Sequence, residues 1–559
     1  MLPLRRRVAL VDCPGADRAA NYFLLIVLLC CALAVPSLFA EQTKKASAPA
    51  PGPAIVGQWA APVYFCPAKP CVVGVNAALM YNGRVLLYYY PPNPEQGSQA
   101  LVLDPVSGNL TWTSLTILRN IFCSGLTILP NGQVMVTGGV IPTQTQPKVH
   151  SEVKNNFGTT STMLFDPATS SWTVGQDMFY ARWYPSTIEL SDGTEMELTG
   201  SNEIGAQVYA METYNYDTGG WTALPDSANV PNAVFDPYAR VSLMPSGNVL
   251  MSVPSQQTYS FNPSTNTWTF VAANNFGDRY FAPHVLLPGQ EKVMVAGGSP
   301  SKSNGGSTAT NTAEIIDMSA ATPAWSYTGA MAYARYNSNL VLLADGTVLV
   351  VGGGGGGGQY TNPVLPAELY NPSTGLWTTM ASQAIQRTYH STAMLLPDGR
   401  VLSTGSDNNE TTQLTYEIYS PPYLFKGKRP RIQTAPTSIT YGSTFTISTP
   451  DAASVTRVAL VRPSATTHAN NFDQRYVDLT FSMSNGSIKA TAPVNGSMAP
   501  PGYYMLVIVN SSGVPSVMPF LNLDTSANQE KNQKKAAPEK SKPGDRKPAA
   551  IPQAQKTGM

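Results

Sequence analysis

The chain has 559 residues, of which 43% are hydrophobic and 12% charged, and it contains 45 Gly, 47 Pro and 27 Tyr. This low charge and wealth of turn-forming residues exclude coiled coils and helical arrays and favour an all-β protein. The formal net charge is +1, but residues 57–525 carry 28 Asp/Glu against 21 Lys/Arg, so this acidic part is not expected to bind nucleic acid.

The N-terminal region has the layout of a secretory signal. Four arginines among the first 18 residues precede an apolar run at 23–35, and a small residue, Ala40, ends the segment. The run is shorter than the ~20 residues that a spanning helix needs. We therefore expect residues 1–40 to be a signal peptide, with an uncleaved membrane anchor as the alternative. The protein is then secreted or extracytoplasmic, and residues 41–56 form a linker by composition.

Three of the six cysteines lie beyond the signal region. Cys66 and Cys71 flank a Pro-containing turn and are candidates for a disulfide in an oxidising compartment. Cys123 is then the odd cysteine of an exported protein, which calls for an explanation other than a disulfide.

Residues 57–427 repeat one short pattern, in which a turn is followed by an apolar strand and a pair of small residues. Examples are NGQVMVTGG at 131, DGTVLVVGG at 345 and DGRVLSTGS at 398. Turn dipeptides in front of apolar runs are typical of β-hairpins. The pattern begins near residues 92, 131, 192, 246, 291, 345 and 398.

Tryptophans mark a second strand of the same repeat. They follow one another at intervals of 47 to 60 residues, at Trp112, Trp172, Trp221, Trp268, Trp325 and Trp377. A period near 50 residues with four short strands is typical of kelch-type propellers. We expect a seven-bladed kelch-type β-propeller over residues 57–427, in which Trp59 begins a segment that completes the last blade. A series of separate sandwiches is the alternative, which the regular period disfavours.

The repeat stops near residue 428. Residues 428–525 contain six short alternating strands, which predict an immunoglobulin-like β-sandwich. Residues 526–559 are rich in Lys, Pro and Ala without apolar periodicity, so we expect a disordered basic tail. We interpret it as a solubilising segment, with contact to an anionic surface as the alternative.

Only four histidines are present: His150, His284, His390 and His468. His390 follows Tyr389 at the entry of a blade strand, near the axis of a propeller, and His468 lies in a polar loop of the C-terminal domain. Nitrogen and phenolate oxygen ligands together suit Cu(II) better than Ca²⁺ or Mg²⁺. A lone histidine is more often structural than a ligand, and we interpret His150 and His284 as structural.

Three blades present reactive side chains at one position of the repeat. We expect Tyr389 in RTYHSTAMLLPDG to occupy the same position relative to its blade strand as Tyr184 in ARWYPSTIELSDG, with His390 directly after it. Cys123 in IFCSGLTILPNG occupies the corresponding place one blade earlier. In a ring of blades, equivalent positions point toward the same axis. The periodicity therefore predicts that these side chains meet.

The same segments carry a family resemblance. FCSGLTILPNGQVMVTGG, ARWYPST, RTYHSTAMLLPDGRV, TTHANNFDQR and PPGYYMLVIVNSSGVPSV resemble the galactose oxidase and glyoxal oxidase family of copper-radical oxidases. The resemblance covers roughly residues 57–525, spans both predicted domains and keeps five separated motifs in order.

The resemblance implies a role for each residue. Cys123 matches the cysteine that forms a thioether with a tyrosine, and Tyr184 matches that tyrosine, an equatorial copper ligand that carries the radical. Tyr389 matches the axial tyrosine that accepts the substrate's hydroxyl proton. His390 and His468 match the two imidazole ligands of one copper ion. The resemblance also implies that the loop of His468 reaches the centre of the propeller.

One position departs from galactose oxidase, which stacks a tryptophan on the cross-linked tyrosine. Asn202 stands at about that place in this chain, whereas Trp183, directly before Tyr184, resembles the arrangement in glyoxal oxidases. The resemblance therefore does not extend to galactose specificity or to the way in which the radical is protected.

Two functions are compatible with these observations. The first is an exported copper-radical oxidase that oxidises a small alcohol, aldehyde or carbohydrate and reduces O2 to hydrogen peroxide, with no organic cofactor. The alternative is a non-catalytic kelch propeller that binds glycan or protein at the cell surface, with membrane contact only if the N-terminal segment is uncleaved. The glycine run at 352–358 lacks the Lys-Ser/Thr of a phosphate loop, and we expect a flexible loop at the rim of the active site.

Overall fold

The computed structural model describes residues 51–66, 71–90, 97–115, 119–141, 157–232, 238–301, 308–407, 412–484 and 486–524. The predicted signal or anchor at 1–40, most of the linker at 41–56 and the tail at 526–559 lie outside these residues, as does His150. The described chain is all-β, with only short helical turns: α1 (Pro53–Val56), η1 (Asp226–Ala228), η3 (Pro422–Phe425) and η4 (Ala452–Ser454). None of these helices is long and apolar enough to cross a membrane.

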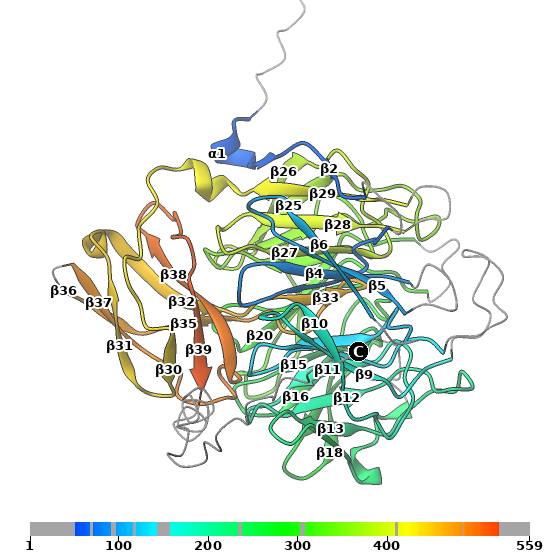
Figure 1. The fold of residues 1–559 in the computed structure, drawn as a ribbon. Coiled ribbons are helices and arrows are strands. Elements are labelled where there is room, and N and C mark those ends of the chain that lie inside the picture. The colour runs from blue at the N-terminus through cyan, green and yellow to red at the C-terminus, as the bar shows by residue number, and fades with distance from the viewer. Residues whose placement is uncertain are drawn as a thin grey trace, which may run out of the picture. The chain divides into compact units, whose positions relative to one another are not determined.

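Most strands belong to small antiparallel sheets, here numbered I to VII in chain order (Figure 1). Each is built around hairpins, as the turn signals predicted, because a glycine-containing turn follows each first strand, with Asn-Gly or Asp-Gly in five of the seven sheets. The strands of sheets I to III are β3 (Asn76–Leu79), β4 (Val85–Tyr88), β5 (Gln99–Leu103), β6 (Leu110–Ser114), β7 (Gly125–Ile128), β8 (Val134–Thr137), β9 (Thr162–Asp166), β10 (Ser171–Val174), β11 (Ser186–Glu189), β12 (Glu195–Leu198), β13 (Glu212–Asn215) and β14 (Gly220–Ala223).

Sheets IV to VI have the same four-strand order. Their strands are β15 (Arg240–Leu243), β16 (Val249–Val253), β17 (Gln257–Asn262), β18 (Thr267–Ala273), β19 (His284–Leu286), β20 (Lys292–Ala296), β21 (Ala313–Asp317), β22 (Trp325–Tyr327), β23 (Asn339–Leu342), β24 (Val348–Val351), β25 (Pro366–Asn371) and β26 (Leu376–Ser382).

Sheet VII joins the two ends of the repeat region. Its strands β27 (Ser391–Leu395), β28 (Val401–Gly405) and β29 (Thr415–Ser420) are extended by β1 (Gln58–Trp59), and β2 (Val63–Tyr64) also pairs with β29. Trp59 pairs with Tyr419, so the prediction that Trp59 begins a segment completing the last repeat is confirmed. Cys66 and Cys71, just beyond β2, form the predicted disulfide.

Neighbouring sheets contact one another through their strands around a ring. Strand β3 contacts β7, β7 contacts β11, β11 contacts β15, β16 contacts β20, β19 contacts β23, and β23 contacts β27. Strand β27 in turn contacts β3, so the last sheet lies against the first. The first strand of every sheet is buried, whereas a fourth strand such as β10 is mostly exposed.

Buried ion pairs recur at the same place in four sheets. Arg182 pairs with Glu212, Arg279 with Glu314, Arg335 with Glu368, and Arg387 with Glu417, at N–O distances of 2.5–3.5 Å. Each arginine precedes a first strand and each glutamate lies on the third strand of its own sheet. Because buried charges are tolerated only when paired and hydrogen-bonded, these pairs hold the entry loops against the sheets.

The C-terminal strands form two further sheets that pack as a sandwich beside the ring (Figure 1). One sheet has the order β30-β39-β38-β32-β35 and the other the order β31-β37-β36. Their bounds are β30 (Ser438–Thr440), β31 (Thr444–Ser448), β32 (Val455–Val461), β35 (Tyr476–Asp478), β36 (Phe481–Ser484), β37 (Ser487–Thr491), β38 (Gly502–Asn510) and β39 (Phe520–Asp524).

One hairpin of the C-terminal region leaves the sandwich and joins the ring. Strand β33 (Ala465–Thr467) pairs with β3 of sheet I, and β34 (Asn470–Asn471) pairs with β33. The segment that carries this hairpin also bonds to first strands of other sheets: Asp473 accepts the backbone N–H of Ile128, and Arg475 donates to the carbonyl of Leu243. The hairpin therefore lies among the first strands, where the family resemblance had implied that the loop of His468 would be.

Candidate metal centre

The strand register aligns the predicted site residues. Cys123, Tyr184 and His390 each lie five residues before the end of a first strand, which ends at Ile128 in β7, at Glu189 in β11 and at Leu395 in β27. All three have positive φ, of 56°, 59° and 64°. Non-glycine residues rarely adopt this conformation, and such strain is concentrated at functional sites.

This register corrects one detail of the sequence analysis. Tyr389 does not occupy the position of Tyr184; His390 does, and Tyr389 stands one residue earlier. Two residues separate the buried Arg387 from His390, whereas one residue separates Arg182 from Tyr184, so the loop RTYH has one residue more before the aligned position than the loop ARWY. Because of this extra residue, one blade supplies two side chains to the site where another supplies one.

Tyr238 was not predicted from the sequence, although it occupies the position in sheet IV that Tyr184 occupies in sheet III. It has φ 53° and is buried, with its ring 4.6 Å from that of Tyr184 and 4.8 Å from that of His468. Its hydroxyl donates to the carbonyl of Ser124, next to Cys123. The signal that identifies it is its place five residues before the end of β15, which the aligned repeats contain.

His468 stands in the tight turn of the β33–β34 hairpin. Thr467 pairs with Asn470, so His468 and Ala469 are the two turn residues, and both have positive φ (49° and 61°). This is the backbone of a type I′ turn, which normally takes Asn-Gly. The carbonyl of His468 accepts a hydrogen bond from Arg240 Nη2 at 3.1 Å, which helps to hold the strained turn in place.

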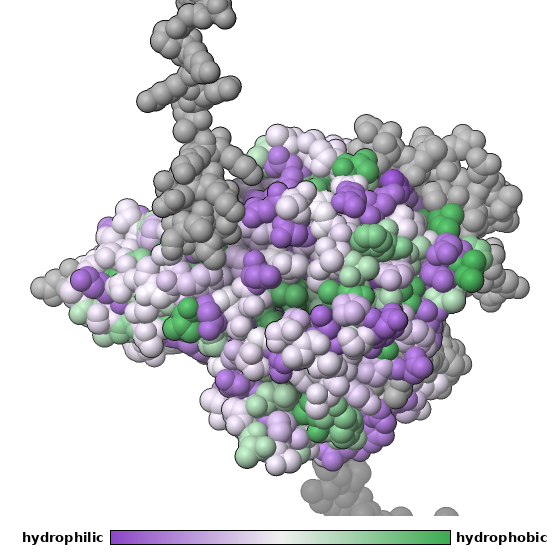
Figure 2. Space-filling model, turned by 90° about the horizontal axis from the view of Figure 1, so that it is seen from below, coloured by the Kyte–Doolittle hydropathy of each residue, from purple (hydrophilic) through white to green (hydrophobic). Residues whose placement is uncertain are grey.

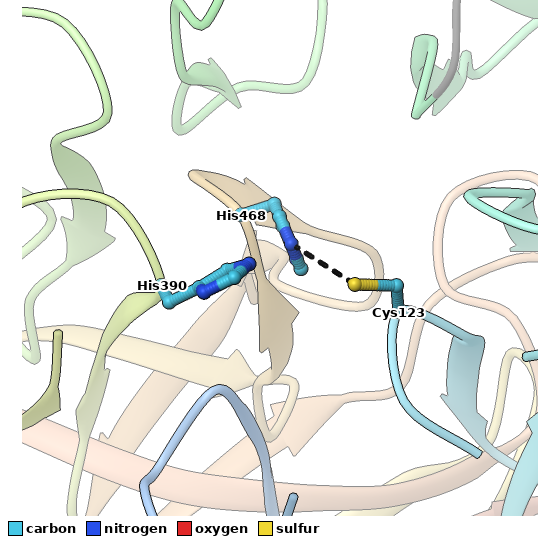
Figure 3. A group of neighbouring side chains, drawn as sticks. All are labelled: Cys123, His390 and His468. Carbon is cyan, nitrogen blue, oxygen red and sulfur yellow. Dashed lines mark hydrogen bonds between the residues drawn. The ribbon is translucent and has the colours of Figure 1, made fainter. Parts of the chain in front are cut away.

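The predicted ligands converge. Cys123 Sγ lies 3.6 Å from His468 Nε2, and ligand atoms of Cys123, His390 and His468 all lie within 4.8 Å of one another (Figure 3). The hydroxyl oxygens of Tyr184 and Tyr389 are 2.5 Å apart. The five residues predicted from sequence are therefore brought together, from segments as far apart as 345 residues.

Aromatic rings enclose this group. The Tyr389 ring stacks on that of His390 at 3.8 Å, and the two histidine rings are 4.6 Å apart and nearly perpendicular. Trp183 contacts Tyr184 edge to face at 3.8 Å, with 71° between the ring planes. Trp183 is therefore the tryptophan in contact with Tyr184, through a ring edge and not by parallel stacking, whereas the side-chain oxygen of Asn202 accepts the N–H groups of Ile204 and Ala206 within its own turn.

Burial sets the protonation states in the site. Loss of water raises the pKa of Cys123, Tyr184 and Tyr389 well above their ordinary values. Burial also lowers the pKa of both histidines, most strongly that of His468, where the nearby His390 and Arg240 add to the effect. The histidines are therefore neutral at neutral pH, as metal ligands must be.

Hydrogen bonds assign the tautomer of His468. The hydroxyl of Thr467 donates to the carbonyl of Val75 at 2.8 Å, so its oxygen accepts from His468 Nδ1 at 2.6 Å. Nδ1 then carries the proton and Nε2 keeps its lone pair. Nε2 is also the atom that faces Cys123, so His468 offers a metal the correct nitrogen.

The hydrogen bonding of His390 shows whether a metal ion fits this group of residues. Both of its ring nitrogens are buried and make no hydrogen bond in the described part of the chain, and the Asp407 carboxylate lies 3.8 Å from Nδ1. A buried polar group without a partner costs about 1–3 kcal/mol. Two neutral imidazoles and two phenols form an N₂O₂ donor set that suits Cu(II), so the residues present fit a copper ion.

The other histidine predictions have different outcomes. His284 is buried in β19, and its Nε2 lies 3.1 Å from the carbonyl of Val241, away from the metal centre, as its structural interpretation requires. His150 lies outside the described residues.

The glycine run lies near the site and is tied down by hydrogen bonds. Thr361 Oγ1 and Asn362 Nδ2 both donate to the carbonyl of Gly356, at 2.8 and 2.9 Å, and the hydroxyl of Tyr336 donates to Gly358. The ring of Tyr360, which follows the run, is 6.0 Å from that of Tyr389. The prediction of a loop near the site is supported, but its backbone is held in place by these bonds.

Comparison with known proteins agrees with this geometry. The family model described as Glyoxal oxidase N-terminus matches residues 98–423, more than half of the chain, and the model Galactose oxidase-like, Early set domain matches residues 429–523. The chain belongs to the galactose oxidase and glyoxal oxidase family.

Similar proteins include named oxidases. A galactose oxidase of Gibberella zeae is 29% identical over 513 residues, covering 85% of this chain and 71% of the relative. Aldehyde oxidase GLOX of Vitis pseudoreticulata is 28% identical over 457 residues, covering 73% and 83%. Among solved structures, a fungal alcohol oxidase in complex with copper matches with a TM-score of 0.73 and 26% identity, over 84% of this chain and 99% of the other.

Proposed function

We propose that this protein is a copper-radical oxidase that oxidises a primary alcohol or an aldehyde and reduces O2 to hydrogen peroxide. The observation that carries the proposal is the buried convergence of two phenols, two neutral imidazoles and one thiol, with the phenol oxygens 2.5 Å apart. Its relatives are named galactose oxidase and aldehyde oxidase, and the matched structure is a copper-bound alcohol oxidase.

The proposed copper ligands are Tyr184, Tyr389, His390 and His468. His468 binds through Nε2, because its Nδ1 donates to Thr467. His390 contributes a ring nitrogen that is otherwise without a partner. The ring stacking of Tyr389 on His390 keeps these two consecutive side chains on the same side of the strand.

Cys123 is proposed to form a thioether with Tyr184. The backbone N–H of Tyr184 donates to the carbonyl of Cys123 at 3.0 Å, and both side chains belong to the same buried cluster, which supports a bond between the thiol and the ring. Joining sulfur to the adjacent ring carbon removes the S–H and one ring hydrogen, with two electrons passing to O2 as oxidant. This step accounts for the odd cysteine, and it makes Tyr184 the side chain that carries the radical.

The chain's own residues move the protons of the reaction. Bound copper supplies one oxidising equivalent and the cross-linked phenol the second, which matches the two electrons that leave an alcohol. Tyr389 Oη is proposed to accept the substrate's hydroxyl proton, and its 2.5 Å contact with Tyr184 Oη places it at the centre of the site. Trp183 packs against Tyr184, which is 8% exposed.

The architecture and location belong to the same proposal. We infer that sheets I to VII are the seven blades of one propeller over residues 57–427, supported by the contact of β27 with β3. Residues 428–525 form the immunoglobulin-like domain that supplies His468. Residues 1–40 direct export, so that the protein is secreted or anchored by that segment.

The test combines three measurements on one preparation of the full chain. Copper content is expected to be one ion per chain, and peroxide is expected to form with a primary alcohol or aldehyde from a screen across galactosides, small aldehydes and aryl alcohols. The Cys123–Tyr184 peptide is expected to lose two hydrogens after exposure to copper and O2. Absence of the cross-link together with absence of peroxide would favour a binding propeller.

Cys123→Ser is the control variant. Its copper content is expected to stay near that of the wild type, because the sulfur is a ring substituent and not a ligand. Its mass loss disappears and its turnover falls strongly, since an unmodified phenol is harder to oxidise. Full activity in Cys123→Ser would refute the radical assignment even with copper present.

A further inference from the structure

Asp407 is a buried carboxylate beside the metal centre to which the sequence analysis assigned no role. It follows β28 in sheet VII, is 6% exposed, and its Oδ2 lies 3.8 Å from His390 Nδ1. A histidine that binds a metal through one nitrogen almost always donates its other N–H to a carboxylate, carbonyl or water. Asp407 is therefore the group to consider for this second bond of His390.

The main chain holds Asp407 at the level of the ligands. Its backbone N–H donates to the carbonyl of Tyr389 at 3.3 Å, and the N–H of the preceding Ser406 donates to the carbonyl of His390 at 2.8 Å. Consecutive hydrogen bonds therefore join the segment of Asp407 to the segment that carries Tyr389 and His390. The carboxylate cannot move far from the imidazole without breaking this pairing.

The side chain of Asp407 is also fixed. Tyr89 donates its hydroxyl to Oδ2 at 2.6 Å, a short bond of the kind formed with an ionised carboxylate, and Thr412 donates to Oδ1 at 3.2 Å. Tyr89 follows β4 of sheet I, so the carboxylate is tied to the neighbouring blade as well as to its own. Oδ2, the oxygen that Tyr89 holds, is also the one that lies 3.8 Å from His390 Nδ1.

Neighbouring rings fix the plane of the His390 ring but not which of its edges faces Asp407. Tyr389 stacks on it at 3.8 Å, and Phe122 contacts it edge to face at 5.3 Å. A half-turn about the Cβ–Cγ bond exchanges Nδ1 with Cδ2 without changing the ring plane, and neither nitrogen has a hydrogen-bond partner in the described part of the chain. A hydrogen-bond acceptor beside Nδ1 would select one of these two orientations.

We propose that Asp407 is a positioning residue for the metal centre: its Oδ2 accepts the Nδ1–H of His390 and directs Nε2 toward the copper. The inference rests on the proposed copper site. Formation of the bond brings Nδ1 and Oδ2 about 1 Å closer than the 3.8 Å that separates them. Asp407 acts through His390 and touches neither substrate nor metal.

The test measures copper binding and copper spectra, not turnover alone. Asp407→Asn, Asp407→Leu and Asp407→Glu are compared with the wild type by competition with a chromophoric Cu(II) chelator and by electron paramagnetic resonance. Asp398→Asn is the matched control, since it lies in the turn at the far end of the same β27–β28 hairpin. Thermal unfolding of each metal-free variant verifies that it is folded.

Asp407→Leu is expected to weaken copper affinity by about 10–100-fold and to change the copper hyperfine splitting. Asp407→Asn, which keeps an acceptor oxygen, falls between it and the wild type, and Asp407→Glu restores part of the affinity. Tyr89→Phe removes the hydroxyl that fixes Oδ2 and gives a smaller loss of the same kind, so the test stands even if Asp407→Leu does not fold.

Two results separate this inference from the function on which it rests. Wild-type protein that binds no copper would refute the proposed function. Wild-type protein that binds copper, with Asp407→Asn and Tyr89→Phe matching it in affinity within about twofold and in spectrum, would overturn the role of Asp407 alone.

Discussion

Replacement of Tyr389 by Phe separates proton transfer from every other property of the site. The substitution removes one oxygen and leaves the ring, so the 3.8 Å stacking on His390 and the contact with His468 at 5.3 Å are retained. What is lost is the hydroxyl that lies 2.5 Å from that of Tyr184.

The size of the effect follows from the proposed role. A positioned general base contributes about 10²–10⁴-fold to a rate, which corresponds to roughly 3–5 kcal/mol of barrier. Tyr389→Phe is therefore expected to lower kcat/KM by that factor. Because Tyr184, His390 and His468 remain, copper content is expected to stay near one ion per chain and the Cys123–Tyr184 cross-link to form.

The assay follows peroxide production with the best substrate found, with copper content and peptide mass measured on the same sample. A copper-loaded, cross-linked and slow enzyme supports the role of Tyr389 as proton acceptor. If the ring were only an apolar plug at the blade entry, Phe would be nearly neutral, and wild-type turnover would refute the assignment.

Two further predictions concern the scaffold. Burial raises the pKa of Glu197 from 4.5 to about 8, so between these pH values the folded state keeps a proton that the unfolded state releases. The contribution of this proton to stability is complete below about pH 4.5 and is lost as the pH rises toward 8. In urea unfolding between pH 5 and 7.5, the free energy of unfolding of the wild type is expected to fall relative to that of Glu197→Gln by on the order of 1 kcal/mol per pH unit. Stability curves of the two proteins that run parallel with pH would contradict this. Glu368→Gln removes the carboxylate that lies 2.5 Å from the buried Arg335, and it is expected to lower the free energy of unfolding by about 3–5 kcal/mol. Asp317→Asn breaks the exposed pair with Lys292, and it is expected to lower the free energy of unfolding by less than about 1 kcal/mol. Equal midpoints for these two variants in urea would show that burial of the pair is not what matters.

The sequence alone predicted the repeating unit and five of the residues that meet in the buried site. Turn dipeptides and apolar runs act over a few residues, so they predict hairpins and the all-β class directly, while the tryptophan interval of 47 to 60 residues predicts the length of the repeat. The same local pattern placed Cys123, Tyr184 and the pair Tyr389–His390 in front of their strands, although it aligned Tyr389 and not His390 with Tyr184, and Trp59 completed the last repeat as predicted. The odd cysteine was also a signal that needed no coordinates.

Only the tertiary structure shows how the side chains of the site come together. The 3.6 Å approach of Cys123 to His468 joins positions 345 residues apart, and it exists because a hairpin of the C-terminal domain pairs with β3. Asp407 lies beside His390 because the end of β28 pairs with the entry loop of β27. No spacing in the sequence predicts that these two side chains are neighbours. The aligned repeats already contain the place of Tyr238, but only the structure shows that its ring packs against Tyr184 and His468, because the first strands of different sheets come together around the same buried group.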